Sequence, residues 1–327
     1  MVGDGSVYVP YEKRDGAESD VYFTRDLSGE GLARIYEKVN GNIVGKTGIK
    51  LHTGERNGPN IIPHDWVKYL MGREPELANA SIVETNTYYA GDRDTTEKHR
   101  KTLEINGWTF CPVDIMDEEG TALLPIKGGK WMQQMSVGSH MLQYDSLVVL
   151  THFKGHVMGG FGGSNKNIGI GCADGHIGKK WIHSHEGEGQ WSIAQEELME
   201  RITESTKATI DFFGEHILYI NVCRNMSVSC DCEGTAAQPV VTPNIGILAS
   251  RDICAVDTAS VDLVYALKEQ DHHDLVERME SRHGLRQLSC MHEMGMGNVR
   301  YRLLDIDHDD RPITQKEAVA DVVPFAG

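Results

Sequence analysis

A short apolar run followed at once by basic side chains is the feature that most constrains the fold. Leu147-Val-Val-Leu150 is an unbroken hydrophobic segment, as a central strand buried on both faces of a parallel sheet requires. The next residues are Thr151-His-Phe-Lys-Gly-His156. Because open α/β sheets bind ligands beyond the carboxyl ends of their strands, these few residues predict both a parallel sheet and the place of its site.

Strand-like and helix-like segments alternate along the chain. Gly48–His52 and Ile217–Val222 have the composition of strands, whereas Thr96–Ile105 and Ser192–Phe213 have helical spacing of apolar residues. This alternation is typical of βαβ units. We therefore expect an α/β fold with a mostly parallel sheet and helices on both faces, built as one domain or as two α/β lobes.

Polar segments at the two ends set the expected domain boundaries. Residues 1–20 are polar and contain glycine, so we expect an N-terminal arm, and residues 308–327 are expected to form a C-terminal tail. The α/β domain then spans residues 21–307. If it has two lobes, we expect them at residues 21–145 and 146–307.

The charge balance argues against several kinds of partner. The 327 residues carry a formal net charge of −16, and a field of this sign repels nucleic-acid phosphates and anionic lipid surfaces. No apolar run approaches the roughly 20 residues of a membrane helix, and the first residues lack the features of a secretory signal. Seven cysteines form no regular disulfide framework. We expect a cytoplasmic protein that binds neither nucleic acid nor membranes.

The basic segment behind the apolar run contains the first candidate site residues. If the extended conformation continues, His152, Lys154 and His156 project to one side, because successive strand residues alternate faces. Two imidazoles and an amine there can hold a metal, accept a proton or bind an anion. We predict Lys154 and His152 as catalytic residues and the two histidines as metal ligands. The alternative is a pair of histidines hydrogen-bonded in a loop.

A glycine-rich segment from Gly155 to Gly171 follows. Its backbone amides and one lysine can surround an anionic group, although the glycine spacing is not that of the dinucleotide-binding fingerprint. The alternative is a tight crossover that needs glycine for positive φ angles. The predicted anion-binding residues are Gly162, Gly163, Ser164, Lys166 and Asn167.

Cys230-Asp-Cys232 is the second focus of candidate chemistry. Two thiols at this spacing can bind a metal, share a cluster or undergo redox chemistry. The carboxylates of Asp231 and Glu233 would raise the thiol pKa values unless a cation offsets them. The alternative is a pair of small buried thiols in a turn. Further candidates of lower rank are Cys172, His183, His216 and Asp231.

Four segments, in this order, together resemble the domain-of-unknown-function family 362. They are His152-Phe-Lys-Gly-His156, Gly163–Cys172, Cys230-Asp-Cys232, and Asn244–Ser250 continued through Asp257. The resemblance covers about residues 21–267 and implies that one site is shared by His152, Lys154, His156, Lys166, Asn167, Cys230 and Cys232. Many members carry ferredoxin-type iron–sulfur motifs, whose closely spaced cysteines this chain lacks. A more distant likeness to the nickel-dependent lactate racemase group concerns architecture alone.

Two functional hypotheses follow. The first is a metal-dependent enzyme that acts on a small anionic organic molecule by racemisation, lyase chemistry or a redox step. A transition metal bound by histidines and cysteines is its expected cofactor, with an iron–sulfur cluster as the alternative. The second is a non-catalytic metal-binding or thiol redox-partner protein. Both require that the histidine segment and the cysteine segment reach one cavity, and neither predicts the oligomeric state.

Overall fold

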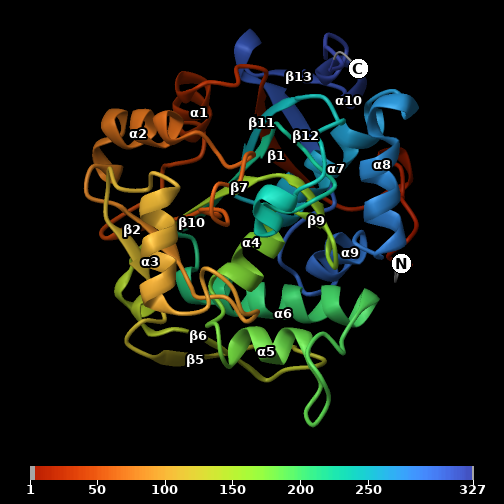
Figure 1. Ribbon diagram of the computed structural model, residues 1–327. Helices are drawn as coiled ribbons and strands as arrows, with labels where there is room; N and C mark the ends of the chain where they lie inside the picture. Colours follow the sequence, from red (N-terminus) through yellow and green to blue (C-terminus); the bar gives the residue numbers. More distant parts are fainter. Residues whose placement is uncertain (1–3, 326–327) are drawn as a thin grey trace.

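One large sheet with helices on both faces forms the body of the computed structural model, which describes residues 4–325 (Figure 1). Within those residues the sheet has nine strands. In spatial order they are β13 (Arg311–Ile313), β12 (Arg300–Asp305), β1 (Glu18–Thr24), β11 (Gly246–Ser250), β10 (Ile217–Cys223), β7 (Ser146–His152), β2 (Thr47–Lys50), β3 (Ser81–Glu84) and β4 (Val113–Ile115). The predicted α/β class is confirmed.

Most neighbouring strands in this sheet run parallel. The five strands β10, β7, β2, β3 and β4 form a continuous parallel half, and β1 and β12 form a further parallel pair. Strand β11 runs antiparallel to both of its neighbours and joins the two parts. The parallel half places the carboxyl ends of its strands at one edge, where α/β proteins usually bind ligands.

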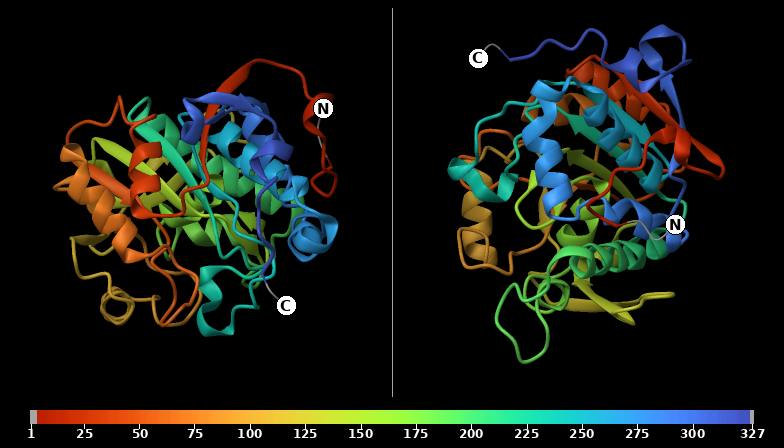
Figure 2. Two further views of the ribbon diagram at one scale, coloured as in Figure 1. Left: turned by 90° about the horizontal axis from the view of Figure 1, so that it is seen from above. Right: turned by 90° about the vertical axis from the view of Figure 1, so that its right-hand side faces the viewer.

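Helices cover the two faces of the sheet. They are α1 (Gly29–Tyr36), α2 (His64–Arg73), α3 (Thr96–Ile105), α4 (Ser164–Gly171), α5 (Gly178–His183), α6 (Gln195–Phe213), α7 (Ile253–Ala266), α8 (Glu269–Ser281), α9 (Arg286–Glu293) and α10 (Gln315–Ala318). Two further views show the sheet between these helices (Figure 2). None of the helices within residues 4–325 combines the length and the apolar character that crossing a bilayer requires.

Strand β7 lies at the centre because both of its faces are apolar. Val148 and Leu150 belong to a core cluster with residues of α1 and α2, whereas Leu147 and Val149 belong to a second cluster with residues of α4, α6 and α7. All seven residues of the strand are buried. This is the environment that the unbroken apolar run predicts.

The remaining segments lie around this body. Two small sheets pair β5 (Thr121–Pro125) with β6 (Gln134–Gly138), and β8 (Lys154–His156) with β9 (Gly160–Gly162). The β8–β9 hairpin directly connects the end of β7 to α4. The predicted tail contributes β13 and α10, and β2 pairs with β7 across the boundary between the two predicted lobes.

A buried carboxylate fixes the start of α4. Asp257, on α7, accepts hydrogen bonds from the backbone N–H groups of Ser164 (2.7 Å) and Asn165 (2.9 Å) and from the side-chain amide of Asn221 (2.8 Å). Complete burial raises the pKa of Asp257 to about 6, more than these three donors lower it. The charged form of this residue is therefore disfavoured in the folded protein.

The pH dependence of stability tests this assignment. The native pKa lies above the ordinary value of 3.8, so the stabilising contribution is fully present below about pH 4 and is lost as the pH rises through 6. We expect the free energy of unfolding of the wild type, measured relative to that of Asp257→Asn, to fall by up to about 3 kcal/mol over this interval. Denaturant unfolding at several pH values measures it. The exposed control Asp15→Asn should follow the wild type, and parallel wild-type and Asp257→Asn curves would refute the assignment.

Candidate functional site

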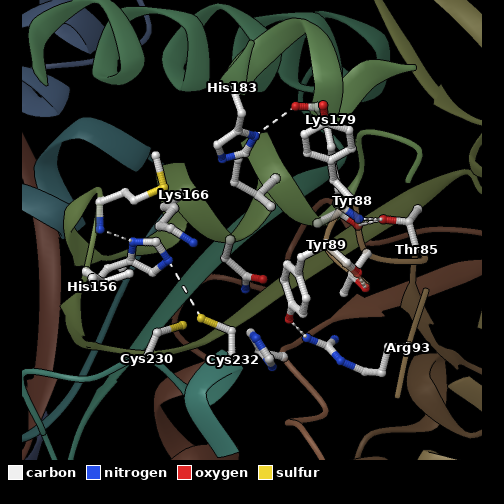
Figure 3. Close-up of a pocket in the computed structure, with 18 of the residues that line it drawn as sticks. Thr85, Tyr88, Tyr89, Arg93, His156, Lys166, Lys179, His183, Cys230 and Cys232 are labelled. Atoms are coloured by element: carbon white, nitrogen blue, oxygen red, sulfur yellow. Dashed lines mark hydrogen bonds between the residues drawn. The ribbon is translucent and has the colours of Figure 1, made fainter. Parts of the chain in front are cut away.

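A cavity of about 470 Å³ lies at the carboxyl edge of the parallel strands (Figure 3). Its lining comes from the last residues of β2 and β3, from the segments that follow β2, β3 and β7, from α4 and α5, and from the short 3-10 helix Asp231–Ala236. The side chains that carry charge or reactive groups are Lys50, His52, Glu84, Arg93, Lys154, His156, Lys166, Lys179, His183, Cys230, Cys232 and Glu233.

The histidine and cysteine segments meet in this cavity because a glycine lets their backbones touch. The N–H of Gly155 donates to the carbonyl of Ser227 (2.8 Å), and a Cβ atom at Gly155 would lie only 2.4 Å from the carbonyl oxygen of Val228. The chain that leads to the thiols therefore packs directly on the β8–β9 hairpin. This contact brings Cys232 Sγ to 3.8 Å from His156 Nε2.

Backbone amides fix which nitrogen of two histidines carries the proton. His156 Nδ1 accepts hydrogen bonds from the N–H groups of Met158 (3.1 Å) and Gly159 (2.9 Å), and His52 Nδ1 accepts one from Gly54 (2.9 Å). Burial lowers the pKa of His156 to about 4 and also lowers the pKa of His52, so both rings are neutral at pH 7. Their single proton therefore lies on Nε2.

Both rings lie beside the thiol pair. His156 Nε2 lies 3.8 Å from Cys232 Sγ, and Cys230 is close enough to His52 to act on its pKa. The sequence analysis missed His52, although it follows β2 at the same sheet edge at which His152 ends β7. The same argument from strand ends would have identified it.

The pKa values of the two thiols shift in opposite directions. A hydrogen bond from Cys232 lowers the pKa of Cys230 well below its ordinary value; burial opposes this shift, and the nearby His156 and Lys154 strengthen it. The pKa of Cys232 is raised by its hydrogen bond to Cys230 and by burial. The pair therefore loses its first proton readily and retains the second.

The carboxylates beside the cysteines point away from the sulfur atoms. Asp231 accepts a hydrogen bond from His152 Nδ1 (2.9 Å) and forms an ion pair with Lys154 Nζ (3.2 Å). Burial raises the pKa of Asp231, but the charges of His152 and Lys154 lower it by a larger amount, so the net shift is downward. Glu233 accepts hydrogen bonds from the Ser229 hydroxyl and the Cys230 N–H. The expected increase of both thiol pKa values is absent for Cys230, because the hydrogen bond from Cys232 and the nearby His156 and Lys154 lower its pKa.

His152 has a different environment from the predicted one. Its Nδ1 contacts Asp231, and its Nε2 lies 2.7 Å from the carbonyl oxygen of Arg224. Contrary to the sequence-based prediction, neither ring nitrogen is free to bind a metal or accept a substrate proton. The predicted alternation is nevertheless observed, since His152 and Lys154 reach the same carboxylate.

The backbone amides that were predicted to bind an external anion already bind a carboxylate of the protein itself. The backbone N–H groups of Ser164 and Asn165 donate to Asp257, and the Asn167 side-chain amide donates to Thr151 Oγ1 (2.9 Å). These donors are satisfied internally, which corrects the predicted role of Ser164 and Asn167 as anion ligands. Four of the five predicted residues still line the cavity: Gly162, Gly163, Lys166 and Asn167.

The cations of the lining differ in their partners. Lys179 donates hydrogen bonds to the Thr85 hydroxyl and the Asn86 carbonyl. Lys50 and Arg93 form ion pairs with Glu84, and Lys154 is paired with Asp231. Within residues 4–325, by contrast, the ammonium group of Lys166 forms neither an ion pair nor a hydrogen bond. Burial lowers its pKa, and Lys154 and Lys50 add to that shift. Lys166 is therefore the cation best placed to meet an external anion.

The lower-ranked candidate residues lie in different parts of the molecule. His183 lines the cavity. Cys172 is buried in the core, where burial raises its pKa to about 11, and His216 Nδ1 contacts the carbonyl oxygen of Asn42 (2.8 Å) at the amino end of the strands. The sequence analysis also missed Arg93 and Lys179, which lie in irregular or helical segments without a strand-end signal.

Three predicted ligands lie close enough for one metal ion. One ligand atom from each of His156, Cys230 and Cys232 lies within 4.8 Å of the others. A metal-bound histidine usually donates its other ring N–H to an acceptor, whereas Nδ1 of His156 faces two backbone donors. The two sulfur atoms are therefore better suited as ligands than the imidazole.

Comparisons with solved structures find distant likenesses. The lactate racemase apoprotein from Thermoanaerobacterium thermosaccharolyticum has 13% sequence identity and a TM-score of 0.44, over 79% of this chain and 59% of that one. A protein from Thermotoga maritima has 15% identity and a TM-score of 0.37, over 59% and 49%. This chain thus spans little more than half of the racemase.

Sequence comparisons place the chain in a family. No curated protein matches it significantly. The family model described as "Domain of unknown function (DUF362)" matches residues 48–262, which include both the histidine and the cysteine segments. The chain therefore belongs to the DUF362 family.

Proposed function

We propose that this protein is an enzyme that binds a small organic anion in the cavity and moves a proton to and from it with the Cys230–Cys232 pair. The observation that carries the proposal is the position of Lys166, a cation with neither an ion pair nor a hydrogen bond within residues 4–325, in the same cavity as a thiol pair with two histidines beside it. Proteins use such arrangements to hold charge at a reacting atom.

Binding of the anion follows from charge and volume. A cavity of about 470 Å³ is within the range of roughly 300–1,000 Å³ that small-molecule sites occupy. Lys166 offers its ammonium group there, whereas Lys50 and Lys154 are already neutralised by Glu84 and Asp231. An anionic group on the ligand gives Lys166 the partner that the protein does not provide.

Proton transfer follows from the protonation of the thiol pair. The lowered pKa of Cys230 favours a thiolate there, and the raised pKa of Cys232 favours a thiol. The thiolate accepts a proton from the carbon beside the substrate's anionic group. The negative charge left on the substrate is stabilised by Lys166. The proton then returns to the substrate, so no electrons are exchanged. Racemisation and many lyase reactions begin with such a step.

A transition metal bound by the two sulfurs is the second candidate. The spacing of His156, Cys230 and Cys232 within 4.8 Å favours it. Cys230 and Cys232 would hold the ion, and the ion would supply a Lewis acid for the bound anion. His52 and His156 would then donate N–H groups to the ligating sulfurs.

Exchange of substrate hydrogen with solvent tests the proposed reaction. Wild-type protein incubated in D₂O with a panel of small organic acids should incorporate deuterium beside the carboxylate of at least one, as followed by NMR. We expect Cys230→Ser and Cys232→Ser to slow this exchange at least about 100-fold, since a hydroxyl is a far weaker acid than a thiol. Cys111→Ser, which makes the same change outside the cavity lining, is the control. Exchange that survives in both thiol variants would rule out the proposed role of the pair.

Removal of the cation tests the binding step. Lys166→Met keeps most of the side-chain volume and removes the charge, so we expect the dissociation constant of the exchanging acid to rise about 10-fold or more. Lys166→Arg should retain part of the affinity. Lys180→Met, an exposed change on neighbouring α5, should bind as the wild type does. Equal affinity of Lys166→Met and the wild type in calorimetry would contradict the assignment.

Elemental analysis separates the two candidates. If the thiol pair acts without a metal, freshly purified wild-type protein should contain no stoichiometric transition metal. About one equivalent of metal that disappears in the Cys230→Ser/Cys232→Ser double variant would instead favour the second candidate. The metal content of the Cys111→Ser variant is the baseline for the wild type and for the double variant.

A further inference from the structure

Three aromatic rings form one wall of the cavity. Tyr88, His183 and Trp191 all belong to the lining. The Trp191 ring meets both others edge-on, with centroids 5.3 Å from Tyr88 and 5.0 Å from His183. In Figure 3, His183 and Tyr88 lie on the side of the cavity opposite Cys230 and Cys232. Rings grouped in this way offer an apolar surface to a ligand.

His183 presents a lone pair where the other two cavity histidines present a proton. Its Nδ1–H donates to the carbonyl of Lys179 (2.8 Å), so Nε2 is an acceptor. Within residues 4–325 this Nε2 has no hydrogen-bond partner, although the residue is only 7% exposed and lines the cavity. Burial, together with the charge of Lys166, lowers the pKa of His183 to about 3, so the acceptor persists at neutral pH.

The backbone at Trp191 is strained in a way that holds the indole at the cavity. Its φ angle is +66°, a left-handed conformation that bulky residues rarely adopt. The hydroxyl of Ser184 accepts a hydrogen bond from the Trp191 N–H (3.3 Å) and also contacts the Tyr88 hydroxyl (3.2 Å). Ser184 therefore links the two rings. Strain of this kind persists where the surrounding contacts enforce it, commonly at ligand sites.

We infer that this wall is a subsite for the body of the substrate, and that the substrate is an aromatic organic anion that also carries a hydroxyl or N–H donor. Its ring packs against Trp191 and Tyr88, its donor group binds His183 Nε2, and its anionic group faces Lys166. The inference rests on the proposed function, because it takes the cavity to be the substrate site. It adds the class of molecule that the site selects.

Binding measurements with simple probes test the subsite. The probes are acetate, cyclohexylacetate, phenylacetate and the three hydroxyphenylacetate isomers, each titrated by calorimetry into the full chain. We expect phenylacetate to bind wild-type protein at least 10-fold more tightly than acetate and several-fold more tightly than cyclohexylacetate. At least one hydroxyphenylacetate should bind another 5- to 10-fold more tightly than phenylacetate.

Two variants assign these preferences to residues. His183→Phe keeps a ring but removes the acceptor, so it should abolish the preference for the hydroxylated probe and keep that for phenylacetate. Trp191→Ala should reduce the affinity for every aromatic probe and leave acetate unchanged. Trp131→Ala, which removes an equally exposed indole outside the lining, is the matched control and should behave as the wild type does.

The possible results separate this inference from the proposed function. If acetate and the aromatic probes bind equally well, the aromatic subsite is wrong while the anion site stands. If the hydroxyl preference survives in His183→Phe, the role of His183 is wrong. Aromatic anions that bind as expected but exchange no deuterium would support the subsite and overturn the proton transfer. If none of the probes binds, both proposals are overturned.

Discussion

The thiol pair has its position because the residue between the two cysteines is a buried carboxylate. Asp231 contacts both His152 and Lys154 at the end of β7, and its carbonyl accepts a hydrogen bond from the N–H of Glu55 after β2 (3.1 Å). A buried charge is tolerated only where partners surround it. Since Cys230 and Cys232 flank Asp231, these contacts together fix both sulfur atoms beside the cavity histidines.

Hydrogen bonds to backbone groups give three chemically identical side chains two different functions. His52 and His156 accept backbone N–H groups at Nδ1 and so carry their proton on Nε2, which in His156 faces Cys232, whereas His183 donates at Nδ1 and so directs a lone pair into the cavity. All three pKa values are lowered by burial. The cavity thus has donors at the thiol wall and an acceptor at the aromatic wall, without any change of net charge.

Local patterns in the sequence predicted the features that depend on nearby residues. The apolar run gave the buried central strand, and alternation along it placed His152 and Lys154 on one side. The prediction that the α4 amides bind an external anion was wrong, because Asp257, 93 residues beyond Ser164, accepts their hydrogen bonds. No local pattern reveals such a distant partner. The same holds for Nε2 of His152, whose acceptor is the carbonyl of Arg224.

Pairing, rather than the number of cations, decides which charge of the cavity is available to a ligand. The chain as a whole carries a net charge of −16, so its long-range field does not attract anions. Lys50 and Lys154 are matched by buried carboxylates, which makes them part of the folded structure. Lys166 lacks such a match within residues 4–325, and burying an unmatched ammonium destabilises its charged form. An anionic ligand pairs with this ammonium group when it binds. Part of the ligand's binding free energy therefore comes from relieving the unfavourable burial of the Lys166 charge.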